Sequence, residues 1–337
     1  MAEPLLDVKD LRVHFPTEDG IVKAVDGISF TIQPGETLGV VGESGSGKSV
    51  SFLTIMGLVT SRQATITGQV LYRGQDMLSM PIDELRTIRG ASMSMIFQDP
   101  MTSLHPFYKV GDQISEAIRA HQPVSKKDGF EQAVEMLRRV GIPRPEERAR
   151  QFPHEFSGGM RQRAMIAMAL SLNPDLVIAD EPTTALDVKV QAQILDQIDR
   201  LKEEFNAAVA IITHDLGVVA EHCDNIQVMY AGKIVETGDR NDIYYSSHHP
   251  YTWGLLRSIP RLDTPVEERL VPIKGLPPSL INVPAGCAFN PRCPYVMDVC
   301  KTDVPPLIPS DGHHASACHL ALKEKERIFQ EEVMATR

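Results

Sequence analysis

The sequence predicts an α/β protein with a parallel β-sheet at its centre. Residues 37–41 and 176–179 are apolar without alternation, as in strands buried on both faces. A helix is predicted at about residues 188–204, and a third buried strand follows at 207–213. Strands that alternate with helices along a chain favour a parallel sheet.

The segments around these strands differ in character. Residues 5–98 have the short, Gly- and Pro-interrupted runs of strands and turns, whereas residues 99–172 show helical spacing of apolar residues. Residues 260–310 are rich in Pro and Cys and lack periodicity. We therefore predict a main domain at 1–240, with a helical subdomain at about 99–172, and a C-terminal extension at 241–337.

Composition limits the possible functions. The 337 residues are 42% hydrophobic and 23% charged, and no run approaches the roughly 18 to 20 apolar residues of a membrane span. The N-terminus lacks the basic start and apolar core of a signal peptide, so we expect a cytoplasmic chain unless a partner holds it to a membrane. The net charge of −10 argues against nucleic acid as a partner.

A phosphate-binding loop is predicted directly after the first buried strand. Residues 42–49 match G-x-x-x-x-G-K-[ST] in full and open a predicted helix. Glycines let backbone N–H groups surround a phosphate, and the helix N-terminus adds partial positive charge. Lys48 would reach the β- and γ-phosphates of ATP, and Ser49 would bind Mg²⁺. The expected nucleotide-binding residues are Gly42, Ser44, Gly45, Ser46, Gly47, Lys48, Ser49 and Val50.

Two carboxylates end the second buried strand. Asp180 would hold Mg²⁺, and Glu181 would polarise the attacking water as a general base. Taken alone, this pattern also fits a strand that ends in a polar turn. The phosphate loop upstream favours the catalytic interpretation.

Four further motifs narrow the family. Ser157, Gly158 and Gly159 form a small-residue turn before a predicted long helix, whose N-terminus suits a γ-phosphate. This turn, with Phe156 before it and Met160 after it, resembles the LSGGQ signature of ABC ATPases. In the order of that family, Gln98 resembles the Q-loop glutamine, Asp187 the D-loop aspartate and His214 the switch histidine. Phe15 lies where the family places an aromatic residue against adenine.

The resemblance covers about residues 5–240 and implies a fold and a mechanism. The implied fold is an ABC ATPase domain, with a RecA-like parallel core, an antiparallel β subdomain and a helical subdomain. Glu181, His214 and Gln98 would be the catalytic residues, with Gln98 also near Mg²⁺. In this family the signature turn completes the site of the opposing subunit, so that ATP joins a head-to-tail dimer. Phe156 and Met160 depart from LSGGQ, but its Ser-Gly-Gly centre is intact.

The C-terminal extension narrows the resemblance further. Residues 249–256 and the Pro- and Cys-rich segment resemble the ATPases of oligopeptide and dipeptide importers, most closely those of the D type. The implied partners are a second, F-type ATPase in a heterodimer, two permease chains and an extracytoplasmic peptide-binding protein, at the cytoplasmic face of the inner membrane. Nickel or glutathione importers of the same family are the nearest alternative, and a soluble ABC ATPase is a more distant one.

Four of the five cysteines lie in the extension and suggest a metal site. They are Cys287, Cys293, Cys300 and Cys318. Four thiolates can hold a [4Fe-4S] cluster or zinc, and the resemblance favours the cluster. Plain reduced cysteines remain an alternative. Three histidines near Cys318 leave mixed ligation open.

Overall fold

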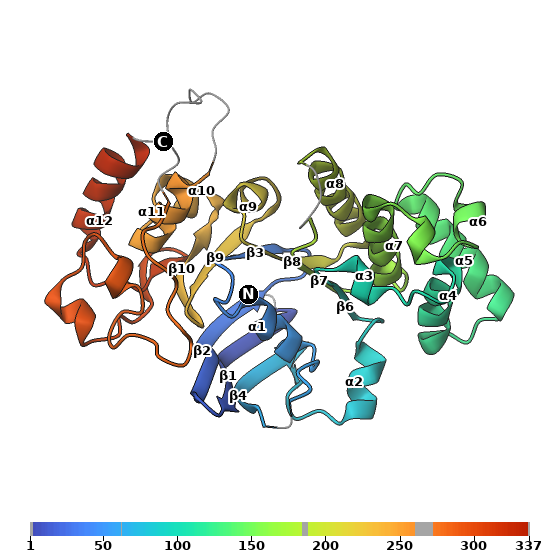
Figure 1. Ribbon diagram of the computed structural model, residues 1–337, viewed down its shortest axis with the longest axis horizontal. Helices are drawn as coiled ribbons and strands as arrows, with labels where there is room; N and C mark the ends of the chain where they lie inside the picture. Colours follow the sequence, from blue (N-terminus) through green and yellow to red (C-terminus); the bar gives the residue numbers. More distant parts are fainter. Residues whose placement is uncertain (1–2, 62, 184–187, 260–271, 336–337) are drawn as a thin grey trace.

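A computed structural model describes residues 3–61, 63–183, 188–259 and 272–335, and its centre is an eight-stranded sheet (Figure 1). The strand order is β11-β12-β10-β9-β3-β8-β7-β6. The helical subdomain and the C-terminal extension lie at opposite ends of this sheet. A smaller four-stranded sheet has the order β2-β1-β4-β5.

The parallel part of the central sheet confirms the predicted buried strands. β3 lies between β8 and β9, and β7 and β6 continue the sheet beyond β8, all in parallel. Every residue of β3, β6, β7 and β8 is buried, which explains their continuous apolar runs. The bounds are β3 Thr37–Val41, β6 Met93–Ile96, β7 Leu176–Asp180, β8 Ala208–Thr213 and β9 Asn225–Tyr230.

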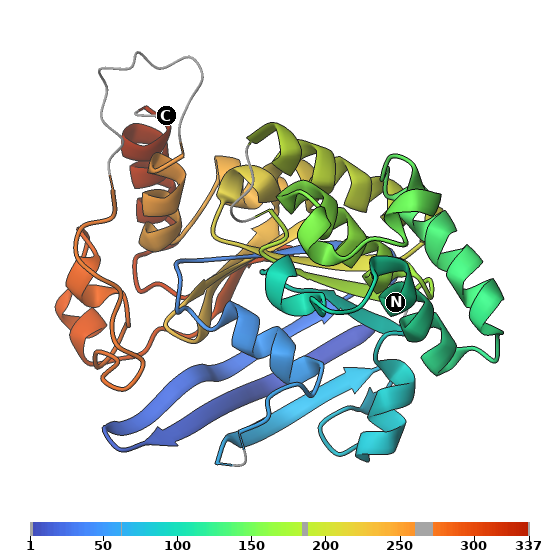
Figure 2. The same cartoon turned by 45° about the vertical axis from the view of Figure 1, so that its right-hand side comes forward.

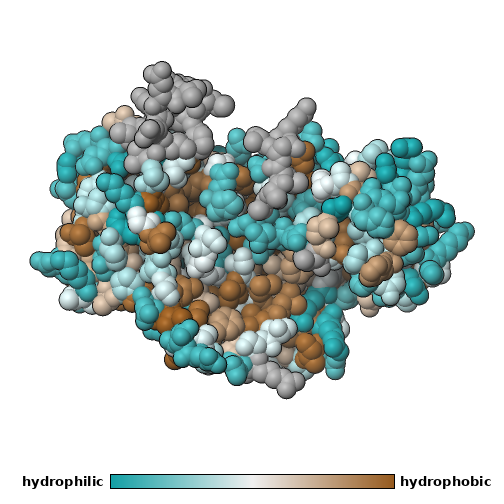
Figure 3. All heavy atoms as spheres, viewed as in Figure 1, coloured by the Kyte–Doolittle hydropathy of each residue, from teal (hydrophilic) through white to brown (hydrophobic). Residues whose placement is uncertain are grey.

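The four-stranded sheet is antiparallel and packs below the central sheet (Figure 2). One hydrophobic core lies between them and contains Leu6 and Val25 from the small sheet and Leu38 and Ile178 from the central one. Apolar side chains also gather near α1 on the face shown in Figure 3. The bounds are β1 Leu6–Thr17, β2 Gly20–Ile32, β4 Thr65–Tyr72, β5 Gln75–Asp76, α1 Lys48–Ile55 and α2 Ile82–Ile88.

Helices α3 to α7 build the predicted helical region. Val110, Ile114 and Ile118 recur along one face of α4 and are fully buried. The side chain of Ser125 caps α5 by accepting the N–H of Asp128. The bounds are α3 Pro100–Ser103, α4 Val110–His121, α5 Lys126–Arg139, α6 Pro145–Arg148, η1 Pro153–Glu155, α7 Gly158–Leu170, α8 Val188–Phe205 and α9 Leu216–His222.

The C-terminal extension continues the central sheet. β12 pairs with β10, with Glu236 opposite Ser316, and β11 pairs with β12. Tyr251, Trp253 and Phe289 belong to the same core as Val41 of β3. The domain boundary at residue 240 therefore stays a prediction, because the sheet crosses it. The bounds are β10 Lys233–Asp239, α10 Arg240–Tyr245, α11 Pro250–Arg257, η2 Asn290–Arg292, η3 Asp298–Lys301, β11 Ile308–Asp311, β12 His314–Ser316, α12 Leu322–Ile328 and η4 Phe329–Met334.

Within the described residues, no helix combines the length and the apolar character needed to cross a bilayer.

We expect that Trp253→Ala lowers the free energy of unfolding by about 3–5 kcal/mol, because it leaves a cavity in the shared core. Trp253 is 1% exposed, and its Nε1 donates to the carbonyl of Ser247 at 2.9 Å. Denaturant unfolding measures the change. Tyr245→Ala, at a side chain 60% exposed, is the control and should change stability by less than about 1 kcal/mol. Equal effects of the two variants would contradict the shared core.

Candidate functional site

The predicted nucleotide residues meet at one edge of the central sheet. Because β3, β6, β7 and β8 are parallel, their carboxyl ends lie side by side at that edge. Gly42 follows β3, Asp180 ends β7, His214 follows β8 and Gln98 comes two residues after β6. The sheet therefore brings together residues that are far apart in the sequence.

The phosphate loop surrounds the ammonium group of Lys48. Its Nζ donates to the carbonyl oxygens of Gly42 at 2.7 Å and Glu43 at 3.0 Å. Lys48 is 4% exposed, and burial lowers its pKa, while nearby carboxylates oppose that shift. Gly47 has φ +100°, and a Cβ there would lie 2.2 Å from the carbonyl oxygen of Ala24, so only glycine fits. Gly45 lies on the exposed side of the loop, where a phosphate can approach.

The side chains of Ser49 and Asp180 place two oxygen atoms next to each other. The Ser49 hydroxyl donates to Oδ1 of Asp180 at 2.9 Å. Asp180 is 6% exposed, and burial raises its pKa, with Glu181 adding to the rise and Ser49 and Lys48 opposing it. A hydroxyl and a carboxylate beside a phosphate loop suit Mg²⁺, which prefers oxygen ligands.

Glu181 contacts both other predicted catalytic residues. Its Oε2 accepts a hydrogen bond from Nε2 of Gln98 at 2.7 Å, and its Oε1 lies 3.4 Å from Nδ1 of His214. The backbone of Glu181 has φ +46°, an unfavourable conformation for a residue with a side chain. Strain of this kind is concentrated at functional sites. The side chains of Gln98, Glu181 and His214 therefore lie together at the edge of the sheet where the phosphate loop begins.

The signature turn opens on solvent. Ser157 caps α7 by accepting the N–H of Met160 at 3.3 Å, so its hydroxyl and the helix N-terminus lie together. Ser157 and Gly158 are exposed, and a Cβ at Gly158 would meet no atom within 4 Å. This surface has room for an anion brought by another molecule.

Two predicted nucleotide residues stand apart from this geometry. Phe15 lies on β1 and is half-buried, so a ring face is available, and its contact with adenine stays a prediction. Asp187 lies outside the described residues.

The four cysteines of the extension lie close enough to interact electrostatically, but they do not complete a ligand set. The thiols of Cys318, Cys287 and Cys300 interact electrostatically with that of Cys293. Burial raises its pKa to about 12. Within the described residues, no group of three or more His, Cys, Asp or Glu side chains is arranged to hold a metal ion. The predicted metal site is therefore not confirmed.

Two of the three nearby histidines, His314 and His319, have other partners. Nε2 of His314 lies 3.0 Å from the fully buried carboxylate of Glu236, and Nε2 of His319 lies 2.9 Å from the carbonyl of Asp303. These contacts do not favour mixed ligation with Cys318.

The sequence did not predict a polar residue that binds the turn after β7, next to Glu181. Gln162, in α7, is 2% exposed and donates to the carbonyl of Pro182 at 2.6 Å, next to Glu181. A polar residue on the buried face of a helix was the available signal.

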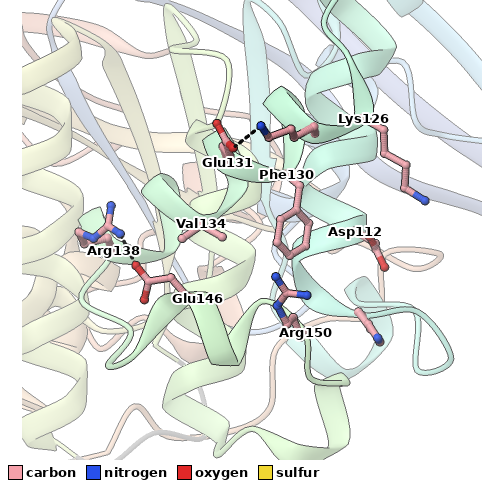
Figure 4. A pocket seen from close by; sticks show the side chains of 10 residues that line it. Asp112, Lys126, Phe130, Glu131, Val134, Arg138, Glu146 and Arg150 are labelled. Carbon is pink, nitrogen blue, oxygen red and sulfur yellow. Dashed lines mark hydrogen bonds and ion pairs between the residues drawn. The ribbon is translucent and has the colours of Figure 1, made fainter.

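A cavity of about 870 Å³ in the helical subdomain (Figure 4) is lined by α4, α5 and α6 and includes none of the predicted site residues.

Comparisons with known proteins identify the family of this chain. Residues 25–184 match the family "ABC transporter", and residues 235–300 match "Oligopeptide/dipeptide transporter, C-terminal region". The oligopeptide transport ATP-binding protein OppD of Salmonella typhimurium is 51% identical over 323 residues, which are 96% of each chain. OppD of Bacillus subtilis is 51% identical over 93% of this chain and 88% of that relative.

Solved structures share the fold. The dimeric ATP-binding cassette MJ0796, bound to ADP and Pi, superposes with a TM-score of 0.63 at 27% identity, over 70% of this chain and 98% of that one. The cbiO1 subunit of Clostridium perfringens, part of an ABC transporter complex, gives 0.61 at 27% identity, over 73% and 92%. This chain therefore belongs to the family of ABC transporter ATP-binding subunits that carry the oligopeptide/dipeptide C-terminal region.

Proposed function

We propose that this chain is the ATP-hydrolysing subunit of an importer of oligopeptides or dipeptides. The observation that carries the proposal is the meeting of Lys48, Asp180 and Glu181 at one sheet edge, in a chain that shares about half of its residues with OppD. Supporting the peptide substrate is the match of residues 235–300 to the C-terminal region of peptide transporters.

The residues suggest how ATP is bound. Lys48 and the N–H groups of residues 44–49 would bind the phosphates, and Phe15 would contact the adenine. Ser49 and Asp180, with Gln98 nearby, would hold Mg²⁺, which neutralises phosphate charge. The exposed turn at Ser157 would bind the nucleotide of the opposing subunit, with Asp187 near the same interface.

Hydrolysis would follow in the closed dimer. Glu181 accepts a proton from the attacking water, and Gln98 and His214 hold the Glu181 carboxylate and the γ-phosphate in position. The ATP-bound dimer is closed and the product-bound dimer is open, because only ATP binds both subunits through its γ-phosphate. This difference in binding would drive transport.

We further propose the subunit arrangement of a peptide importer. An F-type ATPase would be the second cassette of a heterodimer, with two permease chains and an extracytoplasmic peptide-binding protein. The chain would lie at the cytoplasmic face of the inner membrane. A nickel or glutathione importer is the alternative, because substrate choice belongs to the other subunits.

An apolar surface beside Gln98 supports docking of a permease helix. A cavity of about 310 Å³ is lined by Met95, Phe97, Leu104 and other apolar side chains of the core and of the helical subdomain. Phe97 of this lining is 37% exposed, and Phe107, three residues along the chain from Leu104, is 81% exposed. Exposed apolar side chains around such a groove are typical of binding sites for helices. Since Phe97 directly precedes Gln98, movement of a docked helix can reach the catalytic site.

We also propose that the four cysteines hold a [4Fe-4S] cluster, with zinc as the alternative. Supporting this are the nearness of the four thiols to one another and the backbone N–H groups that face three of them: that of Phe289 faces Cys287, that of Tyr295 faces Cys293 and that of Leu320 faces Cys318. Burial raises the pKa of these three thiols and the N–H groups offset part of the rise, so a bound metal would supply the remaining stabilisation of the thiolates. The role would be structural.

We expect Glu181→Gln in this chain alone to lower ATP turnover of the assembled transporter at least about 100-fold while ATP still binds, because the general base is lost. Turnover and peptide uptake are measured in proteoliposomes. The control is Glu203→Gln, at an exposed residue of α8. Unchanged turnover would mean that only the partner hydrolyses ATP. Uptake of nickel or glutathione in place of peptide would establish the alternative substrate.

For the permease surface, Phe107→Asp should weaken association with the permease pair at least about tenfold, because it places a charge in an apolar interface. Co-purification from membranes measures the association. Leu276→Asp, at a side chain 87% exposed in the extension, is the control. An equal effect of both substitutions, or of neither, would place the permease elsewhere.

Anaerobic purification should give about four irons per chain and a broad visible absorption band. Cys293→Ser should remove the iron, whereas Cys223→Ser, at a cysteine buried elsewhere, should not. One zinc and no iron would establish a structural zinc site. A folded chain without metal would rule out both.

A further inference from the structure

An arginine of the extension reaches the phosphate loop. Arg292 ends η2, and its guanidinium binds the carboxylate of Glu43 through both terminal nitrogens, at 2.6 Å from Nη1 to Oε2 and 3.0 Å from Nη2 to Oε1. The side chain of Arg292 is 4% exposed and that of Glu43 is 27% exposed. A bidentate, largely buried pair is stronger and more directional than a surface ion pair.

The arginine is itself fixed by its surroundings. Its Nε donates to the carbonyl of Lys274 at 3.1 Å, and its Cζ lies 5.9 Å from the ring centroids of Tyr230 and Phe289. The hydrogen bonds to Glu43 raise the pKa of Arg292, so the group stays charged. Its position is therefore set by the extension and by β9 together.

The extension also binds the backbone of the same loop residue. The N–H of Glu43 donates to the hydroxyl of Tyr251 at 2.8 Å. Tyr251 lies on α11, is fully buried and packs against Tyr230, with 4.6 Å between ring centroids. Glu43 is therefore bound at its backbone and at its side chain by residues beyond position 240.

The charge of Glu43 connects its pairing with Arg292 to the binding of ATP. The carbonyl of Glu43 accepts a hydrogen bond from Lys48 at 3.0 Å. Its carboxylate is one of three, after Glu181 and Asp180, whose negative charge opposes the lowering of the Lys48 pKa by burial. A carboxylate without a partner at this position would repel phosphate and compete with it for Lys48.

We propose that Arg292 is a positioning residue for ATP binding, which pairs with the Glu43 carboxylate and keeps it away from Lys48. The inference rests on the proposed ATP site at residues 42–49. It assigns to the extension a part in nucleotide affinity, besides any role in holding a metal.

A double-mutant cycle on the full chain tests the proposal, with binding of the non-hydrolysable analogue MgAMP-PNP as the readout. We expect Arg292→Gln to weaken binding about five- to tenfold. Adding Glu43→Gln to that variant should restore affinity to within about twofold of the unsubstituted chain, because the competing charge is gone. In the assembled transporter, Arg292→Gln should raise the KM for ATP with little change in kcat.

Rescue separates positioning from a purely structural role. If Arg292 only held the extension together, Glu43→Gln would not restore binding, and that result would overturn the proposal. Arg292→Met, which keeps the length of the side chain, should show the same weakening and the same rescue. If a substitution of Arg292 folds only when Glu43→Gln is also present, the coupling between the two residues is supported. If it folds neither with nor without Glu43→Gln, the coupling is refuted.

Two controls complete the design. Arg327→Gln removes an arginine of α12 that pairs with Glu324 and Glu331 on the surface, and it should leave affinity unchanged. Lys48→Ala should abolish binding whatever residue stands at position 292. Unchanged binding in Lys48→Ala would contradict the proposed ATP site, whereas unchanged binding in Arg292→Gln alone would contradict only the role of Arg292.

Discussion

The parallel alignment of β3 with β8, and of β8 with β7 and β6, is the constraint on which the site depends. It fixes the carboxyl ends of four strands at one edge. Lys48 follows β3, Gln98 follows β6 and His214 follows β8, while Asp180 ends β7 and Glu181 comes next. Those of these residues that belong to different strands are far apart in the sequence. Each strand is fully buried, so a shift in register would move its side chains out of place in the cores on both faces of the sheet. The cost of that repacking keeps the residues proposed to bind phosphate and magnesium in place.

The same architecture leaves the site incomplete. The phosphate loop lies at the centre of the sheet, whereas the turn at Ser157 begins a helix of the helical subdomain and opens on solvent. A rigid sheet can present one half of a site accurately, but a second copy of the fold can supply the other half at a moving interface. The proposed dimer that closes on ATP would use this separation, because binding energy would then be available to move the subunits.

Sequence alone predicted the buried strands, the phosphate loop and the carboxylates, because each has a local pattern with a physical cause. It did not predict that β11 and β12 would extend the central sheet, since strands of three or four residues give little periodic signal. Gln162 and Arg292 were also missed. Their partners, Pro182 and Glu43, lie 20 and 249 residues away, and only the fold brings them together.

The extension is better understood as part of the ATPase than as an addition to it. Its aromatic residues Tyr251 and Phe289 pack against Tyr230 of β9, the strand next to the phosphate-loop strand β3. Such packing aligns Tyr251 and Arg292 with Glu43. Since Cys293 directly follows Arg292, any group bound by that cysteine lies one residue from the arginine that holds the loop. Order in the Cys-rich segment and order in the phosphate loop are therefore physically linked.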